Sequence, residues 1–139
     1  MRVVLDSNVF VSALISTGTA PDQLYQAWRR GEIEVLTSHD QIAELGEVLR
    51  RPRLRKHVRP DEADLILRNL ASRAVVLSDV PVTAISPDPK DDPILAIALA
   101  GHAELIVSGD KRDMTSLGHV RGIPIRSPRA ALGWLRGEG

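Results

Sequence analysis

The sequence contains no cysteine, so disulfide bonds and thiolate metal sites are excluded. Long hydrophobic runs are also missing, because the longest, Pro93 to Gly101, is far too short to cross a bilayer. Charge of neither sign is in excess: 18 Lys and Arg residues balance 18 Asp and Glu residues. The protein as a whole is therefore not an electrostatic binder of polyanions. With no signal-peptide pattern at the amino terminus, we expect a soluble cytoplasmic protein without a membrane partner.

Several site motifs are missing as well. There is no Walker loop and no Gly-x-Gly-x-x-Gly segment, and no serine lies in a nucleophile-elbow sequence. The histidines lack the spacing of a zinc site; they are His39, His57, His102 and His119. Any catalytic site has to be built from other residues.

Strand and helix patterns alternate along the 139 residues, which we interpret as one domain over 1–139 without repeats. The apolar patterns predict strands at 2–6, 33–37, 74–77 and 105–107, with a weak one near 123–125. Helices are predicted at 7–15, 21–30, 60–72 and 93–100. A further helix is predicted to begin after a cap at Ser38, with Gln41 in the capping-box position, and to end at Arg51-Pro52. The final helix is predicted to begin at Ser127-Pro128. Such alternation favours an α/β fold with a parallel sheet covered by helices on both faces.

Two carboxylates follow apolar strands. Asp6 comes directly after Val3-Val4-Leu5, and Asp110 follows the strand at 105–107 by three residues. In a doubly wound fold the carboxyl ends of the strands face the ligand crevice. The alternatives are that Asp6, Ser7 or Asn8 only caps the next helix and that Asp110 is a turn residue. Asn8 is also placed to support a carboxylate or a metal-bound water.

A third carboxylate is predicted at the start of the apolar helix at 93–100. Asp88, Asp91 and Asp92 cluster before this helix, although capping needs only one acid. Asp92 is favoured over Asp91 because it is next to the helix start.

The fourth candidate is Glu44, on the predicted helix after Ser38. It lies at the border of the helix's apolar face, which is formed by Ile42, Leu45, Val48 and Leu49, whereas Glu47 points away. A residue at this border can reach a crevice between helix and sheet, but most helical glutamates face solvent.

Several carboxylates in one crevice repel one another unless a divalent cation holds them together, and hard oxygen ligands favour Mg²⁺ or Mn²⁺. A basic segment adds a second signal: Arg50, Arg51, Arg53, Arg55, Lys56 and Arg59, with His57 among them. Such a segment suits the phosphates of RNA, although a solvated helix end has the same composition.

Four segments of the chain together resemble PIN-domain proteins. They are Val-Val-Leu-Asp-Ser-Asn-Val-Phe, Ala-Glu-Leu-Gly-Glu-Val-Leu-Arg-Arg-Pro, Asp-Pro-Lys-Asp-Asp-Pro-Ile-Leu-Ala-Ile-Ala-Leu-Ala and Leu-Ile-Val-Ser-Gly-Asp-Lys. The likeness spans essentially the whole chain, and it is greatest to the VapC-related branch of toxins from bacterial toxin–antitoxin pairs.

This resemblance implies a three-layer α/β/α sandwich with a central, mostly parallel sheet, and a metal-dependent ribonuclease. It places the family's four acids at Asp6, Glu44, Asp92 and Asp110, with supporting polar residues at Asn8 and Ser108. The sequence departs from many relatives at Lys111-Arg112-Asp113, where a further acid usually comes two residues after the Asp110 position. The choice between Asp91 and Asp92 stays open by one residue.

We therefore predict an endoribonuclease that uses Mg²⁺ or Mn²⁺, with the basic segment binding RNA. One rival is a phosphohydrolase of the haloacid-dehalogenase type, although Asn8 stands where that chemistry usually needs a second acid. The other rival is a non-catalytic module that binds RNA or protein. A toxin role would imply an antitoxin partner, and the final helix, with Leu132 and Trp134, offers a surface for a homodimer.

Overall fold

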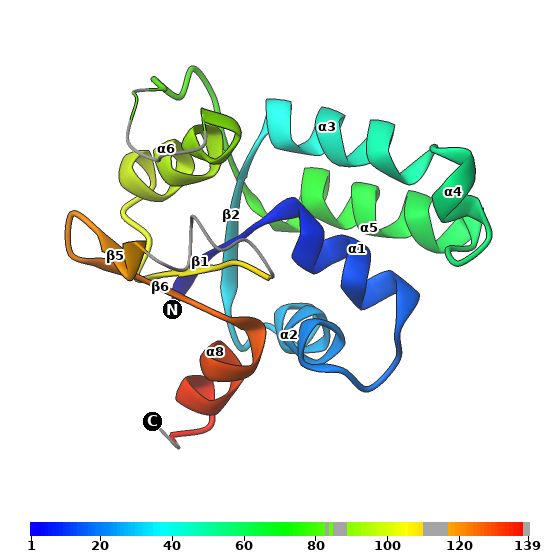
Figure 1. Ribbon diagram of the computed structural model, residues 1–139, viewed down its shortest axis with the longest axis horizontal. Helices are drawn as coiled ribbons and strands as arrows, with labels where there is room; N and C mark the ends of the chain where they lie inside the picture. Colours follow the sequence, from blue (N-terminus) through cyan, green and yellow to red (C-terminus); the bar gives the residue numbers. More distant parts are fainter. Residues whose placement is uncertain (83, 85–88, 110–116, 138–139) are drawn as a thin grey trace.

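The computed structural model describes residues 1–82, 84, 89–109 and 117–137. Within these residues six strands form one sheet in the order β3-β2-β1-β4-β6-β5 (Figure 1). Every neighbouring pair is parallel except β5 with β6, which run antiparallel. The strands are β1 (Arg2–Leu5), β2 (Glu34–Ser38), β3 (Val75–Leu77), β4 (Leu105–Val107), β5 (His119–Val120) and β6 (Ile123–Arg126).

The five predicted strands are confirmed, but the β5–β6 hairpin was not expected. Arg121 and Gly122 connect its two strands, and both have positive φ angles, of 45° and 85°. Two positive φ values are the signature of a type I′ turn, whose twist matches that of a hairpin. β5 is only two residues long, too short for a strand pattern to be visible in the sequence.

The predicted helices are confirmed to within about two residues. They are α1 (Ser7–Ile15), α2 (Ala20–Arg29), α3 (His39–Leu49), α5 (Pro60–Arg73), α6 (Asp92–Ala100) and α8 (Pro128–Leu135). Two short elements were missed, the 3₁₀ turn η1 (Pro89–Asp91) and α4 (Pro52–Arg55). Pro52 does end α3 as predicted, but it also begins α4, because proline fits the first turn of a helix. In the described part of the chain, no helix has the length and apolar character needed to span a membrane.

Alternate residues of β1 contact two separate hydrophobic clusters, one on each face of the sheet. Val3 and Leu5 pack with residues of α1, α2, α3, α5 and α8, whereas Val4 packs with α6. Figure 1 shows α6 on one side of the strands and α1, α3 and α5 on the other. The predicted α/β sandwich with helices on both faces is thereby confirmed.

Trp28 lies in the larger of these clusters. The residue is 5% exposed. Its ring packs against those of Phe10 and Tyr25, at centroid distances of 6.3 and 5.9 Å. Trp28 is therefore a core residue and not a platform on which a base could stack.

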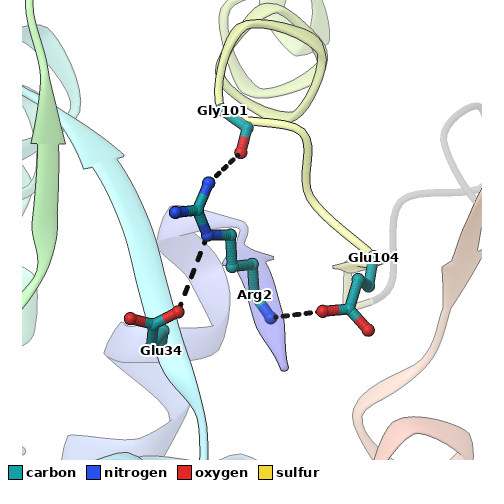
Figure 2. A network of polar contacts seen from close by, with 4 residues as sticks. All are labelled: Arg2, Glu34, Gly101 and Glu104. Carbon is teal, nitrogen blue, oxygen red and sulfur yellow. Dashed lines mark hydrogen bonds and ion pairs between the residues drawn. The ribbon is translucent and has the colours of Figure 1, made fainter.

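Arg2 marks the amino edge of the sheet (Figure 2). Its backbone N–H donates to Glu104 Oε1 at 3.2 Å, and its guanidinium donates to the carbonyl of Gly101 at 3.1 Å. Arg2 Nε also lies 3.6 Å from Glu34 Oε2. These contacts bring together the first residues of β1 and β2 and the connection from α6 to β4. The carboxyl end of α6 is therefore at the amino edge of the sheet.

Candidate active site at the carboxyl edge of the sheet

The strand order reverses between β1 and β4. From β1 the chain adds β2 and then β3 on one side, and it returns to place β4 on the other side of β1. In an open α/β sheet, ligands bind where the order reverses, in the crevice outside the carboxyl ends of the strands. Asp6 directly follows β1, and Ser108 directly follows β4. Both residues thus lie at the position where this fold places a ligand.

The Asp6 carboxylate does not cap α1. Asp6 occupies the N-cap position of this helix, but its side chain accepts no capping hydrogen bond. Instead, Asp6 Oδ2 accepts a hydrogen bond from the Ser108 hydroxyl at 3.3 Å, and the Asp6 N–H donates to the carbonyl of Val107 at 2.9 Å. Asp6 is only 2% exposed and Ser108 is fully buried. The simpler interpretation, that Asp6 is present only to cap the helix, is wrong.

Asp91 and Asp92 begin α6 at this same edge. Because α6 lies in the connection between the parallel strands β3 and β4 and its carboxyl end is beside Arg2, the helix returns from the carboxyl edge of the sheet toward the amino edge. The nine steps from Gly101 back to Asp92 cover about 14 Å of helix, and the four steps from Arg2 to Asp6 cover about 13 Å of strand. The start of α6 therefore lies toward the carboxyl edge of the sheet, the edge at which Asp6 follows β1.

Both of these acids are buried. Asp91 is fully buried and Asp92 is 5% exposed. Asp91 occupies the N-cap position and Asp92 the first helical position, and Asp91 makes no side-chain capping bond to α6. Burial alone thus favours neither residue, and Asp91 joins Asp92 as a candidate ligand.

Two other predicted site residues are exposed, and a third lies outside the described part. Glu44 is exposed in the middle of α3, where it follows Ser38 by six residues, about 9 Å along the helix. Asn8 is also exposed. Asp110 lies outside the described residues, as do Asp88, Lys111, Arg112 and Asp113.

The donor set at this edge consists of carboxylates and hydroxyls, the hard oxygen ligands that suit Mg²⁺ and Mn²⁺. Across residues 1–82, 84, 89–109 and 117–137, no three acidic or histidine side chains are grouped as a metal ion requires. Asp6 and the acids at the start of α6 suit a divalent metal because they are oxygen ligands and lie toward the same edge of the sheet. The described residues alone do not complete a metal site.

Gln41 is a residue whose role the sequence did not reveal. Its backbone N–H donates to the Ser38 hydroxyl at 3.0 Å, so the predicted cap of α3 is confirmed. Its side chain does not return to the cap residue; Nε2 donates to the carbonyl of Leu5 at 2.8 Å. Gln41 is 4% exposed. One feature of the sequence could have indicated that Gln41 is buried: it precedes Leu45 by four residues and Leu49 by eight, which places it on the buried face of the helix.

Comparison with known proteins shows the family to which the chain belongs. The sequence model of the PIN domain matches residues 2–112, four fifths of the chain. The chain belongs to the PIN domain family. It is also similar to the uncharacterized protein MJ1680 of Methanocaldococcus jannaschii, with 30% identity over 118 residues that cover 84% of this chain and 75% of the archaeal protein. PIN domains are typically nucleases, hydrolases that generally use divalent metal ions such as Mg²⁺ or Mn²⁺.

In this PIN domain the basic segment lies away from the carboxylate edge. α3 begins where β2 ends and is 11 residues long, so its far end is about 16 Å from the strand. Figure 1 shows α4 at that far end. The five predicted RNA-binding side chains are all exposed, and none takes part in the ion pairs found among the described residues; they are Arg50, Arg51, Arg53, Arg55 and Lys56.

A hollow of about 250 Å³ adjoins this segment of the PIN domain. Leu49, Val58 and Leu67 contribute apolar surface to it, and Arg50 and Arg55 contribute positive charge. Asp6 and Ser108 are not among its lining residues. The basic segment and the carboxylate edge are therefore two separate features, joined by α3.

Proposed function

We propose that this PIN domain is an endoribonuclease that depends on Mg²⁺ or Mn²⁺. The observation that carries the proposal is the buried Asp6 carboxylate, which is bonded to Ser108 at the reversal of the strand order and does not cap its helix. A carboxylate placed in this way has the chemistry of a metal ligand. Membership of a family of nucleases makes RNA phosphodiesters the proposed substrate.

In this proposal Asp6, Asp92 and Asp110 hold the metal, with Asp91 as the alternative to Asp92. When bound, the ion would lower the pKa of a coordinated water and offset the charge on the leaving oxygen. Ser108 orients the Asp6 carboxylate through its hydroxyl. Glu44 would complete the site or orient the attacking water, and Asn8 would hydrogen-bond a carboxylate or that water. Hydrolysis would leave a 5′-phosphate and a 3′-hydroxyl.

The basic segment would bind the phosphates of RNA beyond the cleavage site. Five of its side chains are exposed, lie about one helix length from the carboxylate edge and make none of the ion pairs found among the described residues; they are Arg50, Arg51, Arg53, Arg55 and Lys56. Their positions suit a strand that continues along α3. We further propose that the protein is the toxin of a toxin–antitoxin pair, with an antitoxin that covers this segment. A homodimer would use Trp134, which is 39% exposed on α8, whereas Leu132 is partly buried against the core.

The deciding experiment is cleavage of RNA by the wild-type protein in Mg²⁺, Mn²⁺ or EDTA, beside Asp6→Asn. The matched control is Asp40→Asn, the same change at an exposed acid in the first turn of α3. We expect metal-dependent cuts by the wild type and the control and none by Asp6→Asn. Hydrolysis of small phosphate esters without RNA cleavage would favour the haloacid-dehalogenase type of reaction. RNA binding with no hydrolysis, unchanged in Asp6→Asn, would identify a non-catalytic module.

A further inference from the structure

We propose that Gln41 is a positioning residue for Asp6. Its amide would hold the two residues on either side of Asp6 in place, so that the carboxylate is fixed before any metal or substrate binds. The catalytic part of this inference rests on the proposed nuclease function, whereas the structural part does not.

The Gln41 amide bonds three neighbouring groups in a buried environment. Nε2 donates to the Leu5 carbonyl at 2.8 Å and lies 3.4 Å from the Ser7 hydroxyl, also as a donor. Oε1 accepts from the Thr37 hydroxyl at 2.6 Å. A carbonyl can only accept, so the amide NH₂ has to face Leu5 and the amide oxygen has to face Thr37. The side chain therefore has one orientation that satisfies all three groups.

This amide fills a gap at the end of the sheet. The pairing of β1 with β2 ends at Val4 and Leu36, although β1 continues to Leu5. On the other side, β1 and β4 still pair at Leu5 and Val107. The Leu5 carbonyl lies one residue past the last β1–β2 pair. Gln41, at the start of α3, donates a hydrogen bond to this carbonyl in place of a residue of β2.

Asp6 is consequently held from two sides. From β4, its N–H donates to Val107 and its carboxylate accepts from Ser108. From α3, Gln41 holds the residues before and after it. At Asp6 the backbone changes from strand to helix, with φ −59° and ψ 147°, so movement of either neighbour would turn the carboxylate. A misplacement of about 1 Å can reduce a catalysed rate about a hundredfold.

A purely structural role, in which Gln41 only satisfies buried polar groups, has a matched control in Asn69. Asn69 is another buried amide, 7% exposed, and its Nδ2 donates to the Tyr25 hydroxyl at 3.1 Å. It lies on α5 and has no hydrogen bond to the segment around Asp6 among those of the described residues. Loss of either amide should destabilise the protein, but only loss of Gln41 should disturb Asp6.

The test compares Gln41→Met with Asn69→Leu in the full chain, using Mn²⁺ and a cleavable RNA. For Gln41→Met we expect kcat to fall about 10- to 100-fold, with KM for RNA within about twofold of the wild type because the RNA-binding segment is untouched. Asn69→Leu should lower Tm but leave both constants within about twofold. If Gln41→Met lowers Tm as Asn69→Leu does and leaves kcat unchanged, the proposal is overturned.

A measurement without metal or RNA separates this inference from the proposed function. The ¹³C resonance of the Asp6 carboxylate and the amide resonances of Ser7 and Val9 should shift in Gln41→Met and stay in place in Asn69→Leu. Unchanged resonances in Gln41→Met would overturn the positioning role even if the wild type cleaves RNA. If the wild type cleaves no RNA, shifted resonances would still support positioning, and only the nuclease proposal would fail.

Gln41→Glu is the second variant, should Gln41→Met not fold. It keeps the size of the side chain and an oxygen for Thr37, but when ionised it removes the donor to Leu5 and Ser7. The same loss of kcat and the same shifts are expected. Wild-type kcat and unshifted resonances in this variant would count against the proposal as they do for Gln41→Met.

Discussion

The hydroxyl of Ser108 donates a hydrogen bond to the carboxylate of Asp6 at 3.3 Å, although 102 positions separate the two residues in the sequence. The bond connects the residue after β4 to the residue after β1, at the point where the strand order reverses. Both side chains are buried, so water competes little for this contact. It joins the Asp6 carboxylate to the end of the strand that leads to Asp110, beside the backbone pairing of β1 with β4.

Replacement of Ser108 by alanine should weaken both the fold and the site. Removal of a buried donor to a carboxylate costs about 1–3 kcal/mol, and a comparable loss in the transition state would reduce RNA cleavage about 5- to 150-fold. Urea unfolding and kcat/KM measure the two effects. Ser72→Ala is the control, because the Ser72 hydroxyl also donates at short range, to the carbonyl of Arg68, but on the exposed face of α5. Equal activities of the two variants would contradict a role for Ser108.

Divalent metal should raise the melting temperature of the wild-type protein. A ligand at one hundred times its Kd stabilises the folded state by about 2.7 kcal/mol, which corresponds to several degrees in a domain of this size. Differential scanning fluorimetry with Mg²⁺, Mn²⁺ or EDTA measures the shift, and Asp6→Asn should abolish it. If Asp40→Asn also loses the shift, the ion is bound elsewhere on the surface.

The two acids at the start of α6 can be distinguished by single substitutions. We expect Asp91→Asn or Asp92→Asn to remove both the Mn²⁺-dependent rise in melting temperature and RNA cleavage, because both residues are buried at the start of α6, toward the same edge of the sheet as Asp6. Asparagine keeps the size of the side chain and removes the charge that a metal requires. The variant that loses both properties identifies the ligand. Full activity in both variants would show that α6 contributes no ligand.

Neutral substitutions in the basic segment should weaken RNA binding without changing the chemistry. We expect Arg53→Ala with Lys56→Ala to raise Kd for single-stranded RNA and to reduce the slope of log K against log salt by about 0.7 per lost phosphate contact. Both side chains are exposed, so the melting temperature should stay the same. Arg129→Ala, an exposed arginine on α8, should leave the slope unchanged. Fluorescence anisotropy over a range of salt concentrations tests the difference.

A side chain at Gly101 should destabilise the fold. A Cβ there would lie 2.7 Å from Leu36 Cδ1 and 3.0 Å from Leu77 Cδ1. Gly101→Ala therefore overpacks the contact between α6 and the sheet, at a cost of about 1–3 kcal/mol. In Gly46→Ala the new methyl group meets Leu67 at 3.6 Å, an ordinary contact, and the change should stabilise α3 by up to about 1 kcal/mol. Urea unfolding should thus give effects of opposite sign.

Some interpretations of single residues needed the structure. On the predicted apolar face of α3, Leu45 and Leu49 are buried, and Glu44 at the border of that face is exposed. Its part in the site stays a prediction. The periodicity of apolar residues shows on which face of its helix a residue lies, but it does not show which other part of the fold that face contacts. Gln41 was predicted as a capping residue, and its side chain bonds Leu5 instead, 36 positions away. The capping pattern is local and contains no information about a distant carbonyl.

The sequence by itself determined the longer helices and five of the six strands, and that acids follow β1 and begin α6; it did not show β5, α4 or η1. Apolar periodicity, prolines and caps act over a few residues, so these features can be read without the fold. The tertiary structure decided which of these residues meet: Asp6 contacts Ser108, and Gln41 contacts Leu5. The physical reason is that such contacts depend on strand order and register, which arise only when the whole sheet packs between its helices.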